Sequence, residues 1–145
     1  MTQNEITQEI SQLERSIADA ERRRAEAEKN ICQLEALKAC CNDYQTEFEH
    51  ARNIRRARLE DFVKIEGQAR LIGAYDMVLR DLLNGPEYIR AYEDMEMAKS
   101  EVSREIERQR QVINECNGQI VGFSSSISVC RQQLAEADKE VRNAG

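Results

Sequence analysis

A heptad of mainly apolar residues runs through the C-terminal part of the chain without interruption. Its seam positions recur alternately at three and four residues, the spacing of a helix that packs along one stripe against another helix. A pattern of this length predicts one long helix over about residues 87–142. The seam positions are Tyr92, Met95, Lys99, Val102, Ile106, Gln109, Ile113, Cys116, Ile120, Phe123, Ile127, Cys130, Leu134, Ala137 and Val141.

A second heptad occupies the N-terminal part of the chain, and here several seam positions are polar. Thr2 followed by Glu5 has the pattern of a capping box, which predicts that a helix begins at this point. Polar seam residues lower the stability of a helix pair but can fix its register. The apolar seam positions are Ile6, Ile10, Leu13, Ile17, Ala20, Ala27, Ile31, Leu34, Cys41 and Phe48, and the polar ones are Arg24, Lys38, Gln45 and Arg52.

The segment Asn84-Gly85-Pro86-Glu87 separates the two heptads. Glycine commonly ends a helix, and proline in a first turn begins one. With only six glycines and one proline in 145 residues, the chain has few other turns, which favours an all-α fold. We therefore predict one domain over 1–145, an elongated antiparallel helical hairpin or coiled coil with arm 1 at about 3–83, a turn at 84–86 and arm 2 at about 87–142. A bend in arm 1 near 40–43 or 67–73 would instead give a three-helix arrangement.

A hairpin that reverses at Gly85 and Pro86 would place residue k opposite about residue 170 minus k. In a straight arm 1, residues 1–28 would then have no intramolecular partner, although they carry apolar seam residues whose exposure costs about 1.5–3 kcal/mol each. Either the arm bends back or another molecule covers it. The partner-binding residues expected from this argument are Ile6, Ile10, Leu13, Ile17, Ile31, Leu34, Ile120, Phe123, Ile127 and Leu134. Apolar residues outside the seam, candidates for a further outer contact, are Leu37, Tyr44, Val63, Val78, Tyr88, Ile89, Val121 and Val129.

Charge and composition argue against several classes of protein. With 21 Lys and Arg against 27 Asp and Glu, the net charge is −6, which disfavours nucleic-acid binding. The arginines at 22–24 and 52–58 could contact anionic lipids, but acidic residues flank both clusters. No apolar run is long enough to span a membrane, and residues 1–10 lack the order of a secretory signal, so we expect a cytoplasmic protein.

Catalytic and metal-binding patterns are also missing from the sequence. His50 lies in a charged helical stretch, where a solvated surface role is the simpler interpretation. The five cysteines contain no C-x-x-C pair, and we interpret them as reduced, mostly buried thiols. We therefore expect no catalytic residue, no metal site and no cofactor, and hence no enzyme.

The arrangement of these segments resembles small helical partner proteins of LXG-type toxins in bacterial type VII secretion, which are similar in style to WXG helical hairpins. The resemblance lies in a leading heptad arm (EISQLERSIADAERR), a glycine-containing middle (FVKIEGQARLIGAY), the Gly-Pro turn and the closing helix (EIERQRQVINECNGQIVGFSSSISVCRQQL). The chain departs from the group in lacking tryptophan, and hence a Trp-x-Gly turn. Tyr92 to Glu96 fits a Y-x-x-x-D/E export pattern, although Tyr92 is also a seam residue.

This resemblance implies an adaptor or targeting chaperone that pairs with the helical N-terminal region of a toxin, with a second small helical protein, or with both. It also implies that the protein can leave the cell with its partner by a route that needs no signal peptide. The alternative hypothesis is a coiled-coil spacer or scaffold that self-assembles as a homo-oligomer. Light scattering of the purified protein separates the two, because a spacer forms a defined oligomer by itself.

Overall fold

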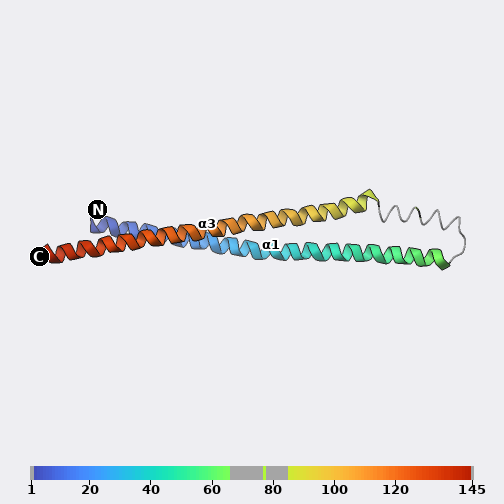
Figure 1. Cartoon of the computed structure of the whole chain (residues 1–145), viewed down its shortest axis with the longest axis horizontal. Coiled ribbons are helices and arrows are strands. Elements are labelled where there is room, and N and C mark those ends of the chain that lie inside the picture. Colours follow the sequence, from blue (N-terminus) through green and yellow to red (C-terminus); the bar gives the residue numbers. More distant parts are fainter. Residues whose placement is uncertain (1, 66–76, 78–84, 145) are drawn as a thin grey trace. The chain divides into compact units, whose positions relative to one another are not determined.

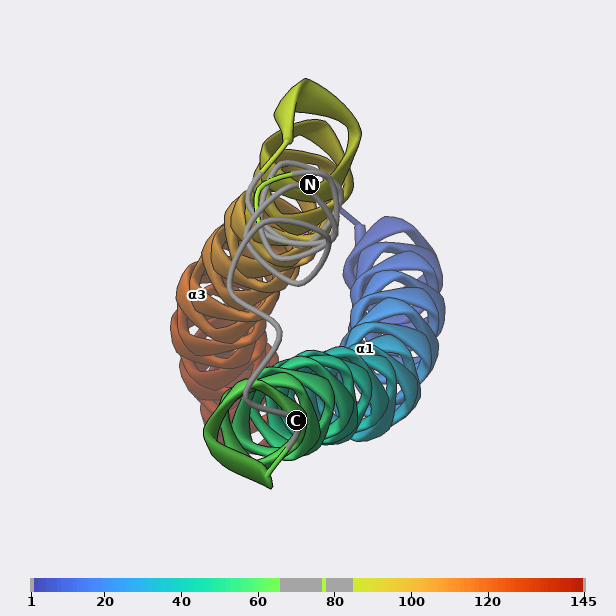
Figure 2. The same ribbon diagram turned by 90° about the vertical axis from the view of Figure 1, so that its right-hand side faces the viewer.

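The computed structural model describes residues 2–65, 77 and 85–144, and within this part of the chain the long elements are helices. Helix α1 spans Gln3–Ile65 and helix α3 spans Pro86–Ala144, and the two pack against each other as an antiparallel hairpin (Figure 1). This confirms the all-α fold. Helix α1 runs without a break through residues 40–43 and is drawn as one coil in Figure 2, so the chain does not fold back into a third helix there. The bend considered at 67–73 lies outside the described residues.

Both helix starts follow the sequence signals. At α1, the Thr2 amide donates to Glu5 Oε2 (3.1 Å) and the Glu5 amide donates to Thr2 Oγ1 (3.3 Å), which is the predicted capping box. At α3, the amides of Tyr88 and Ile89 donate to the Gly85 carbonyl at 3.1 and 3.3 Å. Pro86 in the first helical turn needs no such bond, because it has no N–H group.

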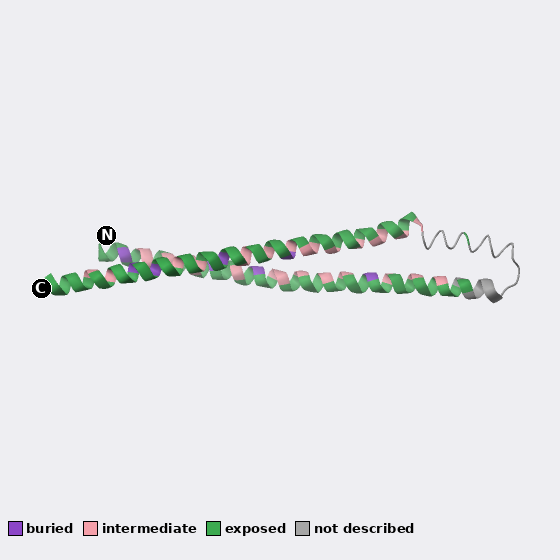
Figure 3. Cartoon of the chain, viewed as in Figure 1, coloured by how far each residue is buried: buried purple, intermediate pink, exposed green. Residues whose placement is uncertain are grey.

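Contacts divide the two helices into two compact units. Unit 1 comprises Met1–Gln33 and Ile106–Gly145, and unit 2 comprises Leu34–Glu105. Within each unit, buried and half-buried residues recur on one side of each helix and exposed residues cover the other (Figure 3). The buried apolar residues of unit 1 are Ile6, Ala20, Ala27, Ile106, Cys116, Ile127 and Cys130.

The predicted seam is confirmed at nearly every position. All described seam residues from Ile6 to Arg52 on α1, and from Tyr92 to Ala137 on α3, are buried or half-buried. Val141 is the exception, because its side chain remains 66% exposed. The heptad thus identifies the contact face of both helices.

The predicted register is wrong. Gln3 pairs with Asp138 and Arg24 with Asn117 in unit 1, while Gln45 pairs with Glu96 in unit 2. Residue k therefore lies opposite about residue 141 minus k, not 170 minus k. The described residues of this segment, 2–28, consequently lie opposite α3, and Ile6 is only 4% exposed. The uncovered N-terminal overhang, from which a partner was inferred, does not exist.

Candidate functional site

Unit 2 contains a cluster of aromatic and charged side chains between its helices. The rings of Phe48 on α1 and Tyr88 on α3 stack with centroids 4.7 Å apart and an interplanar angle of 6°. The guanidinium carbon of Arg52 lies 4.1 Å from the Tyr88 ring centroid, which is a cation–π contact. Tyr88 lies four residues before Tyr92 and so extends the α3 seam by one step. Its prediction as an outer residue is therefore corrected.

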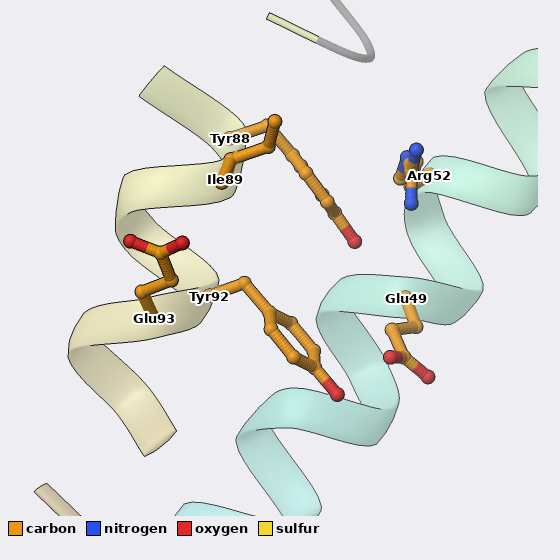
Figure 4. Close-up of a pocket in the computed structure, with 6 residues that line it drawn as sticks. All are labelled: Glu49, Arg52, Tyr88, Ile89, Tyr92 and Glu93. Carbon is orange, nitrogen blue, oxygen red and sulfur yellow. The ribbon is translucent and has the colours of Figure 1, made fainter. Parts of the chain in front are cut away.

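A groove of about 340 Å³ lies beside this stack and is lined from both helices. Figure 4 shows Tyr92 reaching from α3 towards Glu49 of α1, with Tyr88 beside Arg52. The remaining lining residues are Ile89 and Glu93. The Tyr88 hydroxyl oxygen is buried and has no hydrogen-bond partner among the described residues. The groove therefore combines aromatic faces with charge of both signs.

The hydrogen bond from the Tyr92 hydroxyl to the Glu49 carboxylate raises the pKa of Tyr92 above its ordinary value, and the Glu49 charge adds to the effect. Because the folded-state pKa is the higher one, this bond contributes its full stability below about pH 10 and loses it as the pH rises through the raised pKa. Comparing the stability of the parent with that of Tyr92→Phe isolates this bond, because the other groups that titrate at high pH are present in both proteins.

We expect Tyr92→Phe to be less stable than the parent at pH 8, with the difference shrinking above pH 10. Urea unfolding followed by circular dichroism across pH 8–11 measures this difference. Tyr44→Phe serves as the control, because Tyr44 is 68% exposed on α1. A Tyr92→Phe difference that stayed constant with pH would contradict the assigned hydrogen bond.

A fully paired polar group lies further along the same interface. Gln45 is only 6% exposed; its Nε2 donates to Glu96 Oε1 (2.8 Å), and its Oε1 accepts from Lys99 Nζ (2.7 Å). Lys99 Nζ also lies 3.2 Å from Glu96 Oε1. The bond from Gln45 and the charge of Lys99 lower the pKa of Glu96. We name Gln45, Glu96 and Lys99 the polar triad.

Polar pairs also cross between the helices in unit 1. Arg24 Nη1 donates to Asn117 Oδ1 (3.0 Å), and Asn30 Nδ2 donates to Gln109 Oε1 (3.3 Å). Arg24 is thus a polar seam residue that finds a partner at the edge of the interface. Pairing of this kind offsets the cost of placing polar groups along an apolar seam.

Comparisons of the chain with protein-family models, with curated proteins and with solved structures found no match. The structure by itself shows a two-helix antiparallel hairpin.

The ten predicted partner-binding residues all lie in the seam, and none is exposed. Ile6 and Ile127 are buried, and the other eight are half-buried. The hairpin itself covers these side chains, so a partner that contacted them would first have to separate α1 from α3.

The apolar residues predicted outside the seam are, in contrast, largely open to solvent. Five of them are at least half exposed: Leu37, Tyr44, Ile89, Val121 and Val129. The side chains of Val63 and Val78 lie outside the described residues. Three further apolar side chains, which the sequence pattern did not mark, are also exposed: Ile54, Met77 and Met97.

The structure also places His50 and the five cysteines. His50 is exposed, and no group of three potential metal ligands occurs in the part of the chain that the structure describes. No helix among these residues is long and apolar enough to cross a membrane. The cysteines are free, but only Cys116 and Cys130 are buried, so the prediction of mostly buried thiols is wrong for Cys32 and Cys40, which are exposed.

Proposed function

We propose that the chain is a non-enzymatic helical binding protein that docks an amphipathic helix of another protein on the outer side of its hairpin. The observation that carries this proposal is the pair Leu37 and Tyr44 on α1, which are 50% and 68% exposed. They lie seven residues apart and therefore share one face of the helix. A helix face with apolar residues at this spacing suits a second helix.

Unit 2 offers a further apolar contact at the same level of the hairpin. Gln45 bonds to Glu96, so Met97, the next residue of α3, lies near the level of Tyr44. Met97 is 66% exposed, and methionine side chains adapt readily to different partners. Because the seam residues are already covered, these outer residues replace them in our proposal as the first contact with a partner.

The resemblance to LXG-toxin partners supplies the finer part of the proposal. On that basis the bound helix belongs to the N-terminal region of a type VII secreted toxin, and the protein acts as its adaptor or targeting chaperone. It would be made in the cytoplasm and could accompany the toxin during export.

The experiment is calorimetric titration of the protein with the helical N-terminal region of an LXG toxin from the same genome. Leu37→Ser/Tyr44→Ser is expected to weaken binding by roughly tenfold or more, because burying one large apolar side chain contributes about 1.5–3 kcal/mol. The matched control is Ala36→Ser/Asp43→Ser, a pair of exposed α1 residues also seven positions apart. Equal loss in both variants, or no binding by the parent, would contradict the proposal.

The second candidate function is a self-assembling spacer, which the same exposed residues would also serve. In that case light scattering of the protein alone would give a defined oligomer, and Leu37→Ser/Tyr44→Ser would dissociate it.

A further inference from the structure

The polar triad lies within a particular order of seam residues on α1. From residue 38 to residue 52 the successive seam positions are Lys38, Cys41, Gln45, Phe48 and Arg52. Two of these carry positive charge, one is a thiol and one is a phenyl ring. Gln45 is therefore the one residue of this series whose side chain has an oxygen that can accept a hydrogen bond from an ammonium group.

Lys99 on α3 faces this series in the seam and uses that oxygen. Its Nζ lies 2.7 Å from Gln45 Oε1, and its side chain is only 22% exposed. Glu96 of the same helix supplies a second oxygen at 3.2 Å in any register, whereas the oxygen from α1 depends on the register. A half-buried ammonium that loses one of its two oxygen partners becomes less favourable. Lys99 is therefore most stable where it lies opposite Gln45 on α1.

No neighbouring register offers Lys99 an oxygen acceptor from the α1 seam. A slip of one heptad in either direction would bring it opposite Lys38 or Arg52, where like charges repel. A slip of three or four residues would bring it opposite Cys41 or Phe48, where its charge would meet a thiol or an aromatic edge without an oxygen acceptor. The native register is the one in which Lys99 has an acceptor on α1 as well as Glu96 on its own helix.

The same residues disfavour pairing between copies of α1. A parallel, in-register pair of α1 helices would place Lys38 against Lys38 and Arg52 against Arg52 of the second copy. Like charges at opposed seam positions exclude such pairings in coiled coils. The arrangement thus acts against wrong partners as well as wrong registers.

We infer that Lys99, Gln45 and the two flanking cations Lys38 and Arg52 form a register lock that selects the α1–α3 pairing within one chain. The triad thereby determines specificity. A polar layer in the seam is less stable than an apolar one, but it favours one pairing of α1 with α3 over the others. This inference is independent of the proposed function, because it concerns the hairpin and not its outer face.

The test exchanges the side chains of two α1 seam positions, so that the glutamine amide moves by one heptad and the amino-acid composition stays the same. In Lys38→Gln/Gln45→Lys, the residue that accepts Lys99 lies one heptad earlier on α1. We expect α3 to slip by seven residues, so that Tyr88 leaves Phe48 and comes to lie opposite Cys41. Nuclear Overhauser contacts from the Tyr88 ring report the slip directly, since in the parent this ring stacks on Phe48 at 4.7 Å.

Lys99→Gln is the second variant and removes the charge that forbids the slipped registers while it keeps a hydrogen-bonding side chain. For this variant we expect Tyr88 contacts to both Phe48 and Cys41. The control exchange, Lys29→Gln/Gln33→Lys, involves two exposed α1 residues and should keep the Phe48 contact alone. If the first exchange does not fold, Lys99→Gln alone decides. Exclusive Phe48 contacts in Lys99→Gln, or a slip in the control, would overturn the inference.

Discussion

Replacing Ile127 with aspartate is expected to lower the free energy of unfolding by about 3–5 kcal/mol, the usual cost of an uncompensated buried charge. Ile127 lies in the α3 seam of unit 1 and is 7% exposed. Its neighbours in the seam are apolar, so the new carboxylate would lose water. The nearest cation along the helix, Arg131, is 68% exposed and pairs with Glu14. Urea unfolding followed by circular dichroism at pH 7 measures the loss.

Val129→Asp is the matched control for this prediction. Val129 lies two residues further along the same helix and is 54% exposed, so the same carboxylate remains hydrated there. A surface change of this kind usually alters stability by no more than about 0.5 kcal/mol. Similar losses of unfolding free energy in the two variants would mean that positions 127 and 129 of α3 are equally buried in solution. Equally small effects would mean that α1 does not cover Ile127.

The contact faces of both helices could be predicted from the sequence because they depend only on local periodicity. A helix of 3.6 residues per turn turns a three-four pattern of apolar residues into one stripe, whatever lies opposite. Gln45 shows how far this argument extends. Its place in the pattern predicts a seam position despite its polarity, and its side chain is indeed buried.

The register could not be predicted in the same way, because it depends on which residues meet across the hairpin. Gly85 and Pro86 correctly mark the start of α3, but the start of a helix need not be the centre about which two helices pair. Counting from that point shifted every predicted pair by about 29 positions, as the bond between Gln3 and Asp138 shows. The inferred overhang followed from this error alone.

The aromatic cluster was missed for the same reason. Phe48 is a seam residue by spacing, and Tyr88 follows from extending the α3 heptad one step towards Pro86. Their stacking, and the contact of Arg52 with the Tyr88 ring, become predictable only when the register is known. The polar seam residues held the needed signal, since Lys99 finds an acceptor at Gln45 and repulsion at the cationic seam positions one heptad to either side.

Small residues occupy the buried seam between α1 and α3 in unit 1. Ala20 and Ala27 lie one heptad apart in the α1 seam and are each 2% exposed, while Cys116 on α3 is fully buried. Leucine would add side-chain volume at positions that the opposing helix already covers, and overpacking of this kind costs about 1–3 kcal/mol at each site. If the two effects add, Ala20→Leu/Ala27→Leu should lose about 2–6 kcal/mol of unfolding free energy in urea.

The control is Ala18→Leu/Ala25→Leu, a pair with the same spacing on the exposed side of the same helix. It adds the same carbon atoms but meets no opposing helix, so its effect should stay within about 0.5 kcal/mol. The two pairs separate close packing from apolar content, because leucine widens the apolar surface of α1 in both. Stabilisation by Ala20→Leu/Ala27→Leu would mean that the seam of unit 1 has room for larger side chains, and that alanine there does not set how closely the helices approach.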